Sequence, residues 1–260
     1  MGFAMPRAFP ETEFQAFAIA ANDFPPKFPS LEYLSAQMNP ETATPVQLDR
    51  LKKKQHLEGA LQAVRYRYRL CTECSEEFKA LLASPSQMWQ ARTGDEELMY
   101  KLERCIYVFF MSGLSVFESF AFCLYFLGGI IRPDAFPHVS KPKKITLETT
   151  SKAFTAAFPQ AAITACLAEL SQKPEFGTLE DLRNVLAHRV SGRRNVRGRG
   201  EVRDGTYTYE QEETWHLPSS DEKLLFDEGL IQRHLNEINS LLTPLIVAAR
   251  EFAENNRPKE

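Results

Sequence analysis

Apolar residues recur every three or four positions over most of the chain, which is the spacing of amphipathic α-helices. The pattern predicts six helical segments, over 45–83, 95–131, 146–158, 159–172, 179–190 and 227–255, the last kinked at Pro244. Clusters of Gly and Pro follow the second segment and end it. We therefore expect an all-α fold, a helical bundle of four to five main helices.

Three other segments lack this spacing. Residues 1–45 are rich in Pro and Phe and predict an N-terminal arm with at most one short helix, leaving 46–255 as the helical domain. Residues 192–206 contain four glycines and no periodicity, which predicts a loop. Residues 206–217 alternate between polar and apolar side chains and predict a strand, so we expect a small β-hairpin near residues 200–217.

The composition is that of a folded globular protein, with 43% hydrophobic and 25% charged residues. A net charge of −3 gives no general affinity for nucleic acid, so any such affinity must come from a local patch. Five cysteines and no apparent secretion signal indicate reduced thiols and a cytoplasmic protein. The histidines have no metal-ligand spacing, and we expect neither a metal nor a cofactor.

The segment 105–131 is long and apolar enough to span a bilayer. Glu118 stands at its midpoint, where an acid costs about 2.5–3.5 kcal/mol on insertion scales. A helix that is apolar all round is also what the centre of a bundle requires. We expect a central helix and no membrane partner, with a membrane-anchored helical protein as the alternative.

The fifth predicted helix, 179–190, carries the candidate chemistry. Thr178 and Asp181 have the spacing of a capping box after Gly177 and predict where the helix starts. At 100° per residue one face is apolar and predicts the core side, with Leu179, Leu182, Val185, Leu186 and Val190. Asn184 and His188 lie nearly opposite that face. His188 therefore points away from its own core, near a helix C-terminus whose field favours the protonated imidazole.

The residues around and beyond His188 are strongly basic. Between 183 and 203 there are seven arginines and a single acid, Glu201, which gives this stretch a net charge of +6. Arginine is suited to phosphate contacts because its guanidinium is planar and permanently charged. We therefore predict RNA contacts by the arginines that follow the histidine, namely Arg189, Arg193, Arg194, Arg197 and Arg199.

The hexapeptide RNVLAH, Arg183 to His188, resembles the Arg–four-to-six-residues–His motif of the HEPN superfamily, including its polar residue after the Arg, Asn184. Helix order resembles that family over roughly 46–255. The resemblance implies a dimeric helical bundle and a metal-independent ribonuclease, of the kind found in toxin–antitoxin and antiviral systems. It implies that Arg183, His188 and Asn184 are catalytic, with Asn184 supporting the other two, and that Glu118 in SVFESF helps to orient the Arg.

The chemistry gives a separate reason to expect a homodimer. Cleavage of RNA by its own 2′-hydroxyl needs a base and an acid, whereas one chain offers a single well-placed His. The two-fold axis of a homodimer supplies the second histidine from the partner chain. We expect RNA as substrate and an antitoxin or regulatory protein as a possible further partner. The alternative is a non-catalytic HEPN-like module that binds RNA, a nucleotide or a protein.

Overall fold

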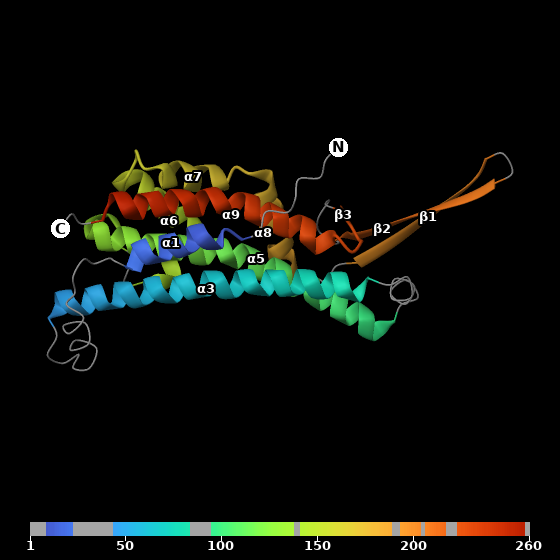
Figure 1. Cartoon of the computed structure of the whole chain (residues 1–260), viewed down its shortest axis with the longest axis horizontal. Helices are drawn as coiled ribbons and strands as arrows, with labels where there is room; N and C mark the ends of the chain where they lie inside the picture. The colour runs from blue at the N-terminus through green and yellow to red at the C-terminus, as the bar shows by residue number, and fades with distance from the viewer. Residues whose placement is uncertain are drawn as a thin grey trace. The chain divides into compact units, whose positions relative to one another are not determined.

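The computed structural model describes residues 9–22, 44–83, 95–137, 141–188, 193–203, 206–216 and 223–257. Within these ranges the chain is mostly helical and carries one small antiparallel sheet (Figure 1), which confirms the predicted fold class. The α-helices are α1 (Glu11–Asn22), α3 (Pro45–Leu81), α5 (Glu96–Ile131), α6 (Leu147–Ala157), α7 (Ala162–Leu170), α8 (Pro174–His188) and α9 (Leu230–Asn255). The strands are β1 (Arg193–Arg203), β2 (Thr206–His216) and β3 (Lys223–Leu225), in the order β1-β2-β3.

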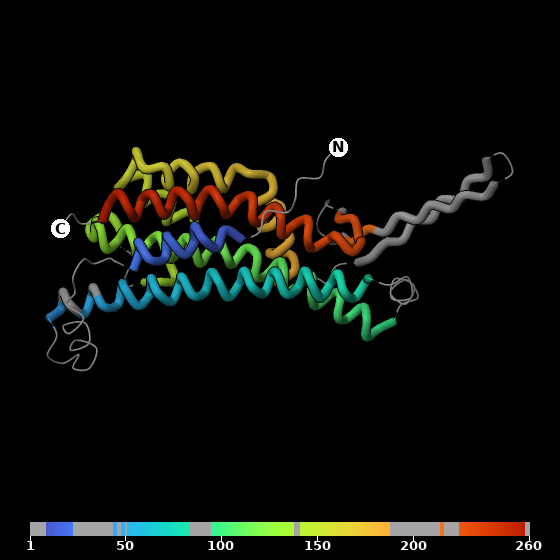
Figure 2. Tube along the Cα trace, in the orientation of Figure 1, coloured from blue at the N-terminus to red at the C-terminus, as the bar shows by residue number. Residues whose placement is uncertain are grey.

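The chain folds into two compact units. Unit 1 comprises Met1–Arg67, Ser115–Phe176 and Ile238–Glu260, and unit 2 comprises Tyr68–Leu114 and Gly177–Glu237. The three longest helices, α3, α5 and α9, each contribute one end to each unit; Figure 2 traces them as continuous tubes. The sheet and nearly all of α8 belong to unit 2.

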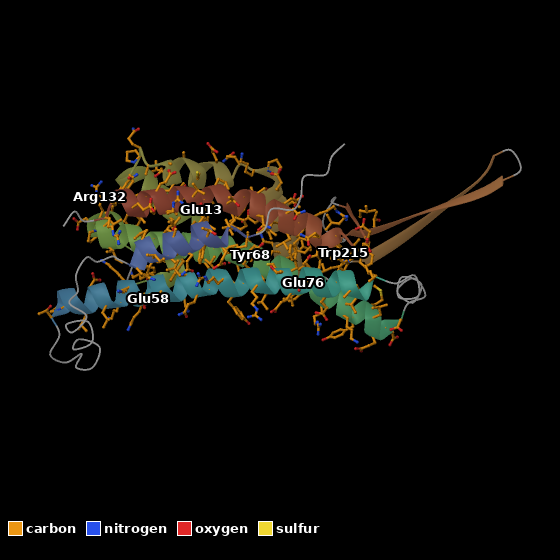
Figure 3. The ribbon with its side chains drawn as sticks, viewed as in Figure 1. Glu13, Glu58, Tyr68, Glu76, Arg132 and Trp215 are labelled. Atoms are coloured by element: carbon orange, nitrogen blue, oxygen red, sulfur yellow. The ribbon has the colours of Figure 1, made fainter. Side chains whose placement is uncertain are left out.

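Helix α1 packs into the core of unit 1. Phe14 and Phe17 on its inner face are fully buried, and the Phe17 ring lies 5.5 Å from the ring of Phe120 on α5. On its outer side Glu13 forms an ion pair with Arg250 of α9; Figure 3 labels Glu13. The one short helix expected within the proline-rich segment is therefore present, and its apolar face is part of the core.

A cluster of aromatic rings fills the rest of unit 1. Phe136 is buried between Tyr125 of α5 and Phe154 of α6, with ring centroids 5.0 and 5.5 Å away. Its ring lies directly against Gly128 of α5, where an added Cβ would come within 2.7 Å of the Phe136 Cε1 atom. Only glycine allows this approach without displacing the ring.

Helix α5 passes through both units. It is long and apolar enough to cross a membrane, but 72% of its most apolar 18-residue window is buried inside the structure. Such burial is typical of the core helix of a bundle. Glu118 on this helix is exposed, so its carboxylate is solvated at the surface.

The core of unit 2 combines an aromatic pair with a buried hydrogen bond. Phe78 of α3 packs edge-on against Phe226 at 5.7 Å. The buried Ser75 Oγ donates to the Gln232 Oε1 at 3.1 Å and so joins α3 to α9. Trp215 of β2 is also buried and fixes the sheet against this core.

Two sequence predictions about local structure are wrong. Helix α8 begins at Pro174, not after Thr178, because Pro is well suited to the first helical position and a helix can include Gly177 at a cost of about 1 kcal/mol. Residues 193–203 form the strand β1 and not a loop, because β2 pairs with them along their full length. The predicted strand over 206–217 is confirmed as β2.

Candidate functional site

Helix α8 has a buried face and an exposed face, as its sequence predicts. Leu179 and Leu182 are buried, with 4% and 1% of their surface exposed. Asn184 is exposed and Arg183 is half-buried at the edge between the two faces. The described part of the candidate motif therefore faces outward from unit 2, where a ligand can reach it.

Arg183 and Asn184 are bonded to each other. The Arg183 Nη1 donates to the Asn184 Oδ1 at 3.1 Å. A guanidinium has five N–H donors in a fixed planar arrangement, so a bond at one nitrogen restricts the orientation of all of them. Asn184 can in this way set the direction in which Arg183 presents its charge.

His188 is the last residue of α8. The final carbonyl groups of a helix have no intrahelical donors and carry partial negative charge, which favours an imidazolium nearby. The orientation of the His188 side chain lies outside the described structure, and so does Arg189 altogether. The predicted direction of His188 therefore stays a prediction.

Glu118, which the HEPN resemblance implies helps to orient Arg183, lies on α5. It is exposed on α5, and its Oε2 accepts a hydrogen bond of 3.3 Å from the Ser115 Oγ one turn earlier. Glu118 belongs to unit 1, whereas Arg183 belongs to unit 2.

The arginine-rich segment is one strand of a hairpin whose other strand is acidic. In the β1–β2 register Arg197 stands opposite Glu212, and Arg199 stands opposite Glu210. Opposite charges in directly opposed positions stabilise a strand pair. Residues 193–216 contain five arginines and five acids, so the hairpin as a whole has no net charge. The part of the +6 stretch that lies in β1 is therefore balanced by acids of its own hairpin, whereas Arg183 and Arg189 lie outside the hairpin.

Within the described strands, the position opposite Arg193 at the end of the sheet where β3 joins is not acidic. Arg193 stands opposite His216, and His216 stands opposite Lys223. In the neighbouring row Arg194 stands opposite Trp215, whose side chain is 2% exposed. The indole Nε1 of Trp215, labelled in Figure 3, has no acceptor within the described part of the chain.

Spacing along the sequence does not bring His216 and Lys223 together with Arg193. They lie seven positions apart in sequence, and Arg193 lies more than twenty residues before them. Only the strand register brings the three positions together. The signal available in the sequence was the alternating segment 206–217, which ends at His216.

The remaining histidines and cysteines of the described residues have structural surroundings. The His234 Nδ1 lies 2.7 Å from the Glu237 Oε2 within α9. Burial raises the pKa of the Cys74 thiol to about 11, with a further contribution from the Glu77 carboxylate. Burial likewise raises the pKa of Cys105 to about 12. No group of three or more His, Cys, Asp or Glu side chains in the described ranges is arranged to hold a metal ion.

Comparison of the chain with protein-family models, with curated proteins and with solved structures found no match. The resemblance to HEPN proteins therefore rests on the RNVLAH hexapeptide and on the order of the helices.

Proposed function

We propose that the protein is a metal-independent endoribonuclease that cleaves RNA by attack of the 2′-hydroxyl, at a site composed from two copies of the chain. The observation that carries this proposal is the outward-facing Arg183–Asn184 pair, which lies one helical turn before the histidine that ends α8. Its residue types and spacing are those of the motif that HEPN ribonucleases use.

Each residue has a distinct role in this reaction. His188 takes the proton of the attacking 2′-hydroxyl or protonates the leaving 5′-oxygen, and the partner copy supplies the second imidazole. Arg183 stabilises the charge that develops on the phosphorane, where loss of one donor costs about 2.7–4 kcal/mol. Asn184 orients Arg183 through the 3.1 Å hydrogen bond. Glu118 is retained only as a candidate supporting residue.

The arginines that follow His188 hold the RNA. The strand register supports unequal contributions, because Arg197 and Arg199 stand opposite glutamates while Arg193 and Arg194 do not. A phosphate that contacts Arg197 or Arg199 must compete with a carboxylate for the same guanidinium. Arg194 shares a row with the buried Trp215, so we assign most of the RNA contact to Arg193, together with Arg189.

The direct test uses purified protein and end-labelled RNA in EDTA. The wild type should yield 2′,3′-cyclic-phosphate ends, His188→Ala should abolish cleavage, and Arg183→Lys should slow it by about a hundredfold or more. Arg69→Lys is the matched control, because Arg69 is an exposed arginine on α3 that pairs with Glu73. Equal cleavage by the wild type and the His188 variant would remove His188 from the mechanism.

The same experiment separates the enzyme from a binding module. RNA that is bound tightly but never cut, by a protein that is dimeric and folded, would favour the non-catalytic module. We further propose that the enzyme acts in the cytoplasm as a toxin or phage-defence effector restrained by an antitoxin or regulatory protein. Toxicity of the wild type on induction in bacteria, lost in the His188→Ala variant, tests that role.

A further inference from the structure

Two carboxylates share the outer face of α8 with the Arg183–Asn184 pair. At 100° per residue, Glu180 and Asp181 lie about 40° and 60° from Asn184 around the helix axis. These three side chains are exposed, whereas Leu182 on the opposite side of the helix is 1% exposed. The burial of Leu182 fixes the orientation of the helix, so both acids point outward beside Asn184.

The same side chains are close together along the helix. Residues three and four apart are neighbours on a helix surface, with Cβ atoms about 5–6 Å apart, so Asn184 lies next to both acids. The Asn184 Oδ1 accepts the 3.1 Å hydrogen bond from the Arg183 Nη1. A cation, an amide and two carboxylates therefore meet within little more than one turn of α8.

The space above this face is open at its N-terminal end. Gly177 lies about 20° from Asn184 around the helix axis. Apart from the helix backbone itself, no atom of the described residues lies within 4 Å of the position that a Cβ would take at Gly177. A ligand can therefore lie along this face without meeting another described element.

A carboxylate distinguishes one RNA base from the other three. It is acceptor-only, with two oxygens side by side. Guanine presents two adjacent donors, N1–H and the N2 amino group, on its Watson–Crick edge, and proteins read that edge in single-stranded RNA. Adenine and cytosine place an acceptor beside their one amino group, and uracil places its single N–H between two acceptors. Among the four bases, only guanine can form a bidentate pair of hydrogen bonds with a carboxylate.

The two acids also restrict where the RNA backbone lies. A phosphate is repelled by Glu180 and Asp181 and attracted by Arg183. Arg183 lies about 100° from Asn184, on the same side as Glu180 and beyond it. A nucleotide whose phosphate contacts Arg183 therefore directs its base across the outer face of α8, toward the acids.

We propose that Glu180 and Asp181 bind the Watson–Crick edge of a guanine next to the phosphodiester that Arg183 contacts, and so make the site selective for guanine in single-stranded RNA. One carboxylate accepts from N1–H and one amino hydrogen, and the other accepts from the second amino hydrogen. That the guanine belongs to an RNA substrate rests on the proposed function, whereas the preference for guanine does not require cleavage. The two acids set specificity and take no part in the chemical step.

The test measures binding of the full-length protein to fluorescent 2′-O-methyl oligouridines, which cannot be cleaved and which differ only in one central base. The wild type should bind the guanine oligonucleotide about tenfold or more tighter than the adenine one, as for a good bidentate contact. Inosine, which lacks the amino group, should fall between them. Glu180→Gln and Asp181→Asn should each lower the guanine-to-adenine affinity ratio, and the double variant should bring it to within about twofold.

Glu175→Gln is the matched control, because Glu175 is an exposed acid in the first turn of α8, about 180° from Asn184. Removal of any of these negative charges can raise the affinity for every oligonucleotide alike, whereas only the loss of a base contact lowers the ratio. All variants should keep the wild-type urea midpoint, since each changes an exposed side chain. A double variant that is folded and retains the wild-type ratio would overturn the proposal.

The outcomes also separate this proposal from the ribonuclease. A protein that prefers guanine but cuts no RNA in EDTA would support the guanine site and refute the enzyme. A protein that cuts RNA but binds all four bases equally would support the enzyme and refute the guanine site. Preference for GMP over AMP that is lost in Glu180→Gln, by a protein that binds no RNA, would refute RNA as the ligand and assign the site to a free guanine nucleotide. Failure to bind any of these ligands would refute the site.

Discussion

Paired substitutions on the two faces of α8 test the orientation on which the candidate site depends. Leu182 is 1% exposed on the inner face, and Asn184 is exposed two residues later. Leu182→Ala removes buried methyl groups and leaves a cavity, which costs about 2–5 kcal/mol of unfolding free energy. Asn184→Ala removes one surface hydrogen bond, and we expect it to change the unfolding free energy by no more than about 0.5 kcal/mol.

For activity per folded molecule the order should be reversed: Asn184→Ala should lower it more than Leu182→Ala does. Without Asn184 the guanidinium of Arg183 is no longer held by the 3.1 Å bond, and a misdirected donor stabilises the phosphorane less. We expect kcat to fall about tenfold or more, in keeping with partial loss of one transition-state donor. Leu182→Ala should retain near wild-type kcat once the rate is divided by the folded fraction.

Urea unfolding followed by circular dichroism, together with cleavage at saturating RNA, measures both quantities on the same preparations. An Asn184→Ala protein that unfolds as readily as Leu182→Ala would contradict the exposed position of Asn184. An Asn184→Ala protein with wild-type stability and wild-type kcat would leave the orientation intact but remove the proposed role of the amide.

Three further predictions concern stability. Gly128→Ala should lower the unfolding free energy by about 1–3 kcal/mol, because the new Cβ overlaps the Phe136 ring; urea denaturation measures it. Burial lowers the pKa of His56, which stacks on Phe126 at 4.6 Å, so protonation favours the unfolded chain. The urea midpoint should fall as pH drops below about 6.5, and less so in His56→Phe. Burial raises the pKa of Cys74 from its ordinary value near 9 to about 11. Its stabilising contribution is thus complete below pH 9 and is lost as pH rises toward 11, a decline that Cys74→Ala should reduce.

The helices could be predicted because their signal is local. The apolar spacing over 45–83 and 95–131 matches α3 and α5 to within about two residues at each end. The same spacing correctly placed Leu182 inside and Asn184 outside on α8. Each of these assignments depends on residues within one or two turns, and a window of that length contains all the information required.

The expected hairpin near 200–217 includes the last residues of β1, but the rest of this strand could not be predicted, because nothing local favours it. Its arginines and glycines have low β-propensity, and the segment has no alternation of apolar side chains. Its structure comes from β2, which pairs with all of it and places Glu210 and Glu212 opposite its central arginines. Its partner strand begins three residues after β1 ends, so the pairing depends on residues outside β1 itself.

Charge counted along the sequence and charge in the paired strands give different pictures of this region. Counted along the sequence, 183–203 is a strongly cationic segment that suits a polyanion over its whole length. In the hairpin register its central positions Arg197 and Arg199 stand opposite Glu212 and Glu210, whereas Arg193 at the β3 end stands opposite His216. Because a carboxylate opposite an arginine competes with a phosphate for it, we expect RNA affinity to depend on which arginines stand opposite glutamates and not on the number of arginines. The RNA contact that we propose therefore depends on strand register and cannot be located by counting arginines along the sequence.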